Sequence, residues 1–285
     1  MRLDHFCAQF HSSFNSPNAA YHAIREDDAS ALDQLLQDQA SEARAPSSSF
    51  QPLLLILLQC LILCESKTCI DKLLLRVRSL REDKFNIQDC LHLLVIKIGL
   101  EKTLTGPQGQ HSLLQEPMDP INSDEVSLPL LNHVLDRLRH NQQPSLYEKD
   151  LFGRLPLHYA AQYSLMEACQ VFLEYMQEWG LVHVPTAFGA ILLQDSEGYT
   201  PLHLVVIGGH TAVTETLLDF HNRNNSTDKM ADVQNLNTIL GNLLAIALKS
   251  DFVEIVQLLV ATDVNIDHQG TYGETALYIA ARSGR

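Results

Sequence analysis

The sequence predicts an all-α fold, a solenoid of stacked helix-turn-helix repeats, on three observations. Two segments of closely similar pattern begin at Asp150 and Asp195. Apolar residues recur at helical spacing along both segments. Hydrophobic residues make up 46 % of the 285 residues, enough to bury a core, which excludes a chain that is disordered throughout.

The first half of the chain carries a fainter form of the same pattern. Residues 1–16 are assigned to an N-terminal tail, and residues 17–148 to divergent helical repeats with loop insertions at 43–49 and 103–126. Two segments contain a polar break between two helical patterns, a third resembles the start of another repeat, and a fourth is expected to be one long helix. These segments are 18–37 (broken near Asp27-Asp28), 53–77 (broken at Glu65-Ser66), 86–102 and 127–140.

One stretch in this half, "LLLILLQCLILC" at residues 53–64, is apolar enough to suggest a membrane span. A transmembrane helix needs about 20 apolar residues, and this run is shorter. Pro52 precedes the run and Glu65 follows it. We therefore expect a buried helix and no membrane partner.

The repeat at "DSEGYTPLH" shows the chemistry of each turn. Gly198 permits a positive φ, Thr200 is placed to cap the first helix, and Pro201 occupies its first turn. Gly208-Gly209 is expected to end that helix. The equivalent structural positions in the other repeats are Gly153, Pro156 and His158, and, at the end of the chain, Gly273 and Thr275.

Two histidines at the same place in the motif, His158 and His203, could be taken for catalytic or metal-binding groups. No acid or nucleophile accompanies them at the spacing of a catalytic triad. We expect their imidazoles to bond to the Thr side chain or the turn backbone and to brace adjacent turns.

Four repeats are assigned to the second half, at residues 149–194, 195–237, 238–270 and 271–285, the last one incomplete. Ala247 and Ala280 occupy equivalent places 33 residues apart, the period of ankyrin repeats, which this half resembles. The longer upstream repeats imply loop insertions at 177–194 and 221–237.

The last stretch, "GETALYIAARSGR", matches only the first half of a repeat. Leu277, Ala280 and Ala281 are expected to pack on the preceding repeat. Since the second helix does not follow, we expect a piece of a longer protein, with apolar surface left bare at a weakly protected end.

Composition excludes several classes of function. The formal net charge of −14 argues against nucleic-acid binding, which needs a basic surface. This charge either keeps the protein in solution or suits a basic protein partner. The cysteines lack metal-ligand spacing, and neither a phosphate-binding loop nor any other cofactor motif is found. The N-terminus lacks the apolar stretch of a signal peptide, so an intracellular location is expected, cytoplasmic or nuclear.

Three segments taken together carry a closer resemblance: "FGRLPLHYAAQY", "CQVFLEYMQEWG" and "SEGYTPLHLVVIGGH". Over residues 146–220 the chain is similar to the ankyrin segment of the fungal SPX–ankyrin–glycerophosphodiester phosphodiesterase family. That family includes glycerophosphocholine phosphodiesterases and a phosphate-starvation regulator that inhibits a cyclin-dependent kinase. Residues 1–40 do not look like an SPX domain, and the His-Arg-Gly start of the phosphodiesterase active site is absent from the sequence.

The resemblance implies a non-catalytic protein-interaction module in phosphate signalling or glycerophosphodiester metabolism. Its partners would be a cyclin–kinase complex or other domains of the parent protein. A scaffold for a catalytic barrel outside this chain and an unrelated ankyrin adaptor remain alternatives. Turn tips and first-helix ends are the candidate partner-binding positions: Phe152, Arg154, Gln162, Tyr163, Glu197, Tyr199, Ile207, Tyr272 and Glu274.

Overall fold

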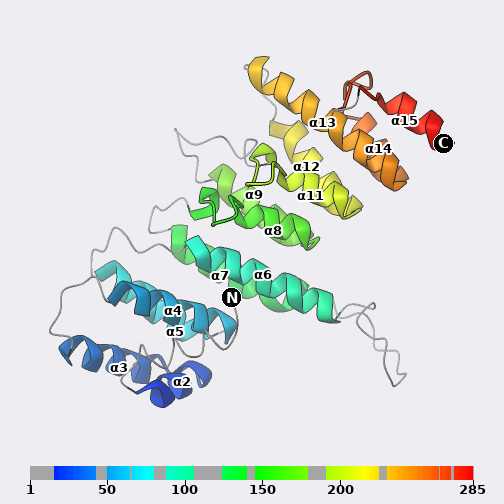
Figure 1. Cartoon of the computed structure of the whole chain (residues 1–285). Helices are drawn as coiled ribbons and strands as arrows, with labels where there is room; N and C mark the ends of the chain where they lie inside the picture. The colour runs from blue at the N-terminus through cyan, green and yellow to red at the C-terminus, as the bar shows by residue number, and fades with distance from the viewer. Residues whose placement is uncertain are drawn as a thin grey trace, which may run out of the picture. The chain divides into compact units, whose positions relative to one another are not determined.

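The computed structural model describes most of the chain as α-helix. Described are residues 16–42, 50–64, 66–79, 88–105, 124–139, 145–178, 191–224, 230–262, 264–270 and 273–284. The chain divides into two compact units, residues 1–97 with 125–145, and residues 98–124 with 146–285. Each unit is built from helices laid side by side, and among the described residues there is no strand (Figure 1).

In the first unit, helices follow one another in pairs: α2 packs on α3, α4 on α5, and α3 on α5. The helices of this unit are α2 (Pro17–Arg25), α3 (Ala29–Glu42), α4 (Phe50–Leu63), α5 (Lys67–Ser79), most of α6 (Gln88–Thr105) and α7 (Asp124–Arg139). The breaks expected near Asp27-Asp28 and Glu65-Ser66 are confirmed, and so is the long helix expected at 127–140.

The turn between α2 and α3 anchors the next helix pair. Asp27 has a positive φ of 51°, and its carboxylate accepts the backbone N–H groups of Thr68 and Cys69 at 3.1 and 3.0 Å. These N–H groups lie at the start of α5, where a helix leaves its donors unsatisfied and favours negative charge. Asp27, in the polar break expected between two helices, thus helps to join the first helix pair to the second.

The apolar stretch expected at 53–64 falls in α4 up to Leu63, and its described side chains between Ile56 and Ile62 are buried except for the half-buried Gln59. Ile56, Leu57 and Leu61 are 5 % exposed or less. This confirms the buried helix. No helix in the described parts of the chain is both long enough and apolar enough to cross a membrane.

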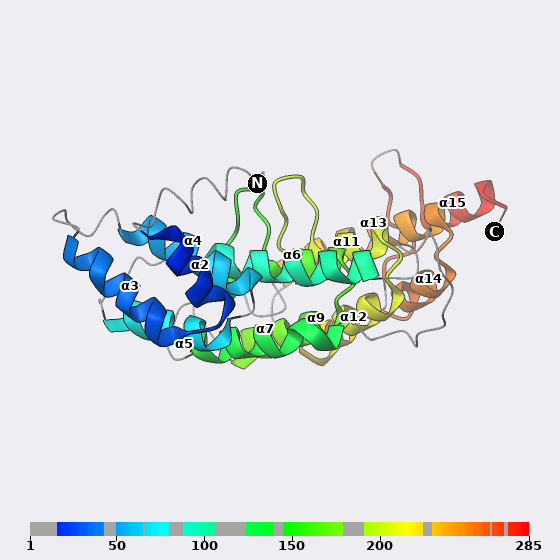
Figure 2. The ribbon, with the colours of Figure 1, turned by 90° about the horizontal axis from the view of Figure 1, so that it is seen from below.

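In the second unit, the first helices of successive repeats form one row and the second helices form another. α8 packs on α11, α11 on α13 and α13 on α15, while α12 packs on both α9 and α14 (Figure 2). These helices are α8 (Pro156–Gln162), α9 (Met166–Glu178), α11 (Pro201–Ile207), α12 (Thr211–Asn224), α13 (Met230–Ser250), α14 (Val253–Val260) and α15 (Ala276–Arg282), preceded by a 3₁₀ turn, Ser145–Tyr147. The all-α repeat fold expected from the sequence is confirmed.

The loop expected at 221–237 is wrong for residues 221–224 and 230–237, and residues 225–229 lie outside the described part of the chain. α12 continues to Asn224, and α13 already begins at Met230. No Pro or Gly occurs between Met230 and Leu240, so nothing in this polar stretch stops a helix that later buries Leu243 and Ala247. Of the other expected insertions, 43–49 lies wholly outside the described residues, and 103–126 and 177–194 lie mostly outside them.

The apolar stripe expected on the last helix is also wrong in part. Ile279 is the buried residue of α15, at 4 % exposure, whereas Leu277 is 79 % exposed and Ala281 is exposed. The main packing neighbour of α15, a seven-residue helix, is α13.

Candidate functional site

The turns that precede α8 and α11 carry most of the candidate residues, and each is held by one aspartate. Asp150 Oδ1 accepts the backbone N–H groups of Phe152 and Arg154, both at 2.9 Å. Gly153, with a φ of 70°, donates its N–H to the Asp150 carbonyl. Asp195 makes the same set of bonds with the residues two, three and four positions ahead of it. Both turns therefore share one hydrogen-bonded conformation of the Asx type.

The two turns are also bonded to each other. The Ser196 N–H donates to the Phe152 carbonyl at 2.9 Å. Arg154 Nε donates to Asp195 Oδ2 at 3.0 Å, with the Asp195 side chain fully buried. In Figure 2 the turns extend from the row of first helices on the side away from the second helices. Their backbone is thus fixed before any partner arrives.

Arg154 was expected to face a partner, but its guanidinium contacts residues of this chain. Besides Asp195, its guanidinium donates to Gln162 Oε1 at 3.0 Å and lies 5.5 Å from the centre of the Tyr159 ring. Burial would raise the pKa of Asp195, but backbone N–H groups, chiefly that of Tyr199, and Arg154 hold it below its ordinary value. Arg154 and Gln162 therefore stabilise the turn pair.

His158 is enclosed in the core and bridges two segments of backbone. Its Nδ1 accepts the Leu155 N–H at 3.0 Å, and its Nε2 lies 3.0 Å from the Leu193 carbonyl, to which it donates. Both bonds are satisfied by a neutral imidazole with its proton on Nε2. Burial lowers the pKa of His158 to about 4, although Asp195 and hydrogen bonding to the backbone of Leu193 and Tyr199 oppose the shift. This imidazole has no free nitrogen for a metal or a substrate.

His203 holds the start of α11 together with Thr200. Thr200 Oγ1 accepts the His203 backbone N–H at 3.1 Å and lies 2.8 Å from His203 Nδ1. Pro201 follows Thr200 as the first helical residue, where no N–H is needed. The Thr-Pro-Leu-His motif is in this structure a helix N-cap. Among the described residues, no cluster of His, Cys, Asp and Glu side chains could hold a metal ion.

Exposed apolar side chains mark the tips of the turns. Leu151 is fully exposed, Phe152 is 66 % exposed and Tyr199 is 37 % exposed. Glu197, two residues before Tyr199, is also exposed. We call these four residues the turn-tip surface. Leu151 was missed by the sequence analysis, although an apolar residue in a turn built by Asp and Gly is the signal that could have found it.

The remaining candidates are placed differently. Ile207, 46 % exposed, ends α11. Tyr163 packs so closely on α6 that a Cβ added to Gly99 would lie 2.2 Å from its ring. Glu274 is half-buried and forms ion pairs with Lys249 at 3.0 Å and Arg282 at 3.4 Å.

Tyr272 lies outside the described residues. Beside it, Gly273 has a φ of 72°, and Thr275 Oγ1 accepts the Tyr278 N–H at the start of α15. The turn before α15 thus repeats the glycine and the threonine cap found before α11.

Comparison with known proteins agrees with this geometry. The family model for ankyrin repeats in three copies matches residues 128–230. The chain is 32 % identical over 248 residues to a glycerophosphocholine phosphodiesterase GDE1 of Candida albicans, covering 82 % of this chain and 20 % of the relative. It is 30 % identical over 284 residues to the protein of that name from Eremothecium gossypii, covering 90 % of this chain and 20 % of the relative.

A third relative is the probable 26S proteasome regulatory subunit p28 of Saccharomyces cerevisiae, 23 % identical over 150 residues. That match covers 53 % of this chain and 59 % of the relative. The chain spans only a fifth of the length of the two phosphodiesterases, so what those whole proteins do is carried over only as a proposal.

Proposed function

Because residues 128–230 match the ankyrin-repeat family model and the chain is similar over most of its length to fungal GDE1 proteins, we propose that it binds a protein partner through the turn-tip surface. Ankyrin repeats indicate a protein-interaction module, and the ankyrin region is a non-catalytic fold. The partner and the place of contact are the proposal.

The observation that carries this proposal is the exposure of Leu151 and Phe152 on a turn that is already rigid. Exposed aromatic and aliphatic side chains are costly in water and are common anchors of protein interfaces. A fixed backbone also spares the entropy that a mobile loop would lose on binding. The hydrogen bonds of Asp150 and the bond from Ser196 to Phe152 supply that fixation.

The proposed partner class rests on the family resemblance of the sequence and on the names of two relatives. Two relatives are named glycerophosphocholine phosphodiesterases, so we propose a role in fungal glycerophosphodiester metabolism or phosphate signalling, with a cyclin–kinase complex as one partner to test. A second candidate partner is a catalytic domain of the same longer polypeptide, which the repeats would position. The relatives' greater length favours this second candidate.

The test is affinity capture from fungal extract with the chain and with a Leu151→Ser/Phe152→Ser variant. We expect the variant to lose the partners that the unmodified chain retains, as quantified by mass spectrometry. Leu277→Ser is the matched control, because it removes another exposed leucine far along the sequence from the turn tips. An unchanged partner set in the double variant would overturn the turn-tip assignment.

The captured proteins also separate the two candidates. A cyclin–kinase or other phosphate-pathway component supports the signalling role. A glycerophosphodiester phosphodiesterase domain, whose binding to the purified chain is then weakened by the Leu151→Ser/Phe152→Ser change, supports the positioning role.

A further inference from the structure

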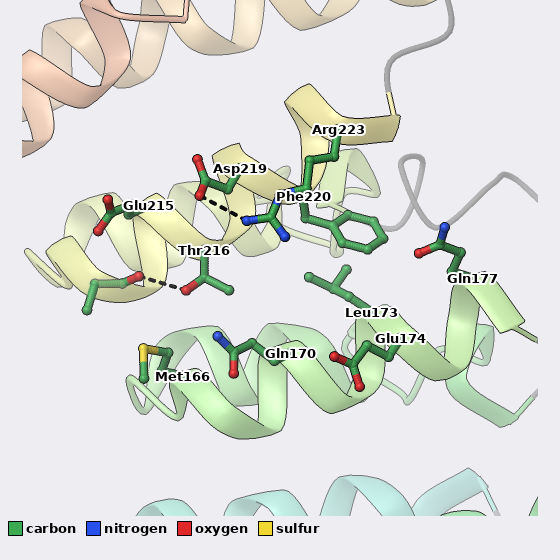
Figure 3. A pocket seen from close by; sticks show the side chains of 11 residues that line it. Met166, Gln170, Leu173, Glu174, Gln177, Glu215, Thr216, Asp219, Phe220 and Arg223 are labelled. Carbon is green, nitrogen blue, oxygen red and sulfur yellow. Dashed lines mark hydrogen bonds and ion pairs between the residues drawn. The ribbon is translucent and has the colours of Figure 1, made fainter.

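A groove of about 570 Å³ lies between α9 and α12, the second helices of two successive repeats (Figure 3). Its size is within the ~300–1,000 Å³ typical of ligand clefts. The half-buried Met166 and Phe220 provide apolar surface in it, while Leu173 of α9, which also lines it, is fully buried. The second helices lie on the side away from the turn tips, so this surface is distinct from that of the proposed function.

The charge of the groove is unbalanced. Glu174 of α9 and Glu215 of α12 line its two walls, and both are exposed. Neither carboxylate has a hydrogen-bond or ion-pair partner among the described residues. Among the described residues that line the groove, Arg223 is the one basic residue, and it forms an ion pair with Asp219 at 3.3 Å. Two carboxylates on opposite walls are therefore left without a counter-charge.

The shape of the groove favours an extended occupant. Its lining on α12 runs from Ala212 to Arg223, which is three helical turns or about 16 Å. An elongated groove with apolar surface between two acidic walls is complementary to an amphipathic helix that has basic residues on both sides of an apolar stripe. The net charge of −14 further favours a cationic partner over an anionic one.

We propose that the groove between α9 and α12 binds a basic amphipathic helix of a partner protein. Lysine or arginine side chains of that helix contact Glu174 and Glu215, and its apolar side chains pack on the half-buried Met166 and Phe220. The groove is thus a second interaction surface, and it does not depend on the turn-tip surface.

The test uses a fluorescein-labelled 14-residue helical peptide with leucines on one face and lysines on both flanks. Its binding to the full chain is followed by fluorescence anisotropy. We expect saturable binding that weakens as salt is raised, because exposed charges are screened. A counterpart with Glu in place of every Lys, and another with Gln in place of every Leu, should each bind at least tenfold more weakly.

Variants of the chain locate the binding. Glu174→Lys/Glu215→Lys should lower the affinity at least tenfold, because it turns two attractions into repulsions. Glu254→Lys/Asp267→Lys is the control, an equal change of charge at exposed positions of the same unit outside the groove, and should bind as the unmodified chain does. Equal far-UV circular dichroism of both variants shows that each is folded.

Three results would overturn the proposal: no binding of the basic peptide, equal losses in the two charge variants, or loss of binding in Leu151→Ser/Phe152→Ser. The last result would place the peptide on the turn tips and leave the proposed function standing. Conversely, a turn-tip variant that keeps the peptide but loses captured partners separates the two surfaces.

Discussion

Arg154 and Asp195 form the contact through which one turn holds the next. The Asp195 side chain is fully buried, and that of Arg154 is 19 % exposed. An ionised carboxylate out of water is stable only when its hydrogen bonds are satisfied. Two backbone N–H groups and the guanidinium satisfy Asp195, so Arg154 belongs to the structure of the repeat pair rather than to a free binding surface.

Arg154→Ala should therefore act on stability. We expect it to lower the free energy of unfolding by about 2 kcal/mol, the usual loss when a hydrogen bond to a buried charged group is removed. Arg223→Ala removes an exposed i,i+4 pair with Asp219 and should cost about 0.5 kcal/mol or less. Urea unfolding of both variants measures the difference. Equal stabilities would show that the Arg154 pair is no stronger than a surface pair.

His158 makes stability depend on pH. Burial lowers its pKa to about 4 from the ordinary value of 6.5, so the unfolded chain takes up this proton first as pH falls. The contribution of neutral His158 to the free energy of unfolding is complete above pH 6.5 and is lost progressively between pH 6.5 and 4. At pH 5 the loss amounts to about 2 kcal/mol.

The measurement compares urea unfolding at pH 7.5 and pH 5 in the chain and in His158→Asn. The variant should be less stable at pH 7.5. The decrease in its free energy of unfolding from pH 7.5 to pH 5 should be smaller by about 2 kcal/mol than in the unmodified chain. Burial also lowers the pKa of His203, His210 and His221, and both proteins share those contributions. The same decline in both proteins would argue against the neutral, buried state of His158.

At the scale of elements, the turn glycines differ in what surrounds them. Gly153 and Gly198 both have positive φ values, 70° and 85°. A Cβ at Gly153 would lie 2.9 Å from the backbone N of Ser196, whereas a Cβ at Gly198 would meet nothing within 4 Å. Gly153 therefore allows the backbone of its own turn and leaves room for the next turn to pack against it. Gly198 is needed only for the backbone of its own turn.

Alanine at these two positions separates the effects. Gly198→Ala should cost about 1 kcal/mol, the penalty for a left-handed backbone with a side chain. Gly153→Ala should cost at least about 2 kcal/mol, because it adds a clash that pushes Ser196 away from the Phe152 carbonyl. Thermal or urea unfolding gives both values. A smaller loss at Gly153 than at Gly198 would mean that the turns are not held against each other.

The helices of the motif could be predicted because their signals are local. Thr200, Pro201 and the glycines act within a few residues, and apolar spacing sets the buried face. The loop expected at 221–237 failed over the parts that are helical because a polar composition does not by itself distinguish a helix from a loop. The role of Arg154 could not be predicted either, since its partner Asp195 is 41 positions away in sequence and meets it only when the repeats stack.

For the molecule as a whole, stacking decides which repeat positions become core. Leu157, Leu202 and Leu277 occupy the same place in α8, α11 and α15. The first two are at most 1 % exposed, whereas Leu277 is 79 % exposed. The residue type and the local motif are unchanged, so the difference comes from the neighbours of each helix. In the second unit α11 packs on both α8 and α13, whereas the first helix on which α15 mainly packs is α13.

Backbone protection should therefore differ between α11 and α15. Amide hydrogen exchange reports local opening, which is easier where few apolar contacts must be broken. We expect peptides covering Ala276–Arg282 to exchange at least tenfold faster than peptides covering Pro201–Ile207. Both helices have seven residues and a threonine N-cap, so length and capping are matched. Equal protection across Tyr278–Ala281 would mean that a helix of this chain is stable with one packed side, and that stacking is not what stabilises the repeats.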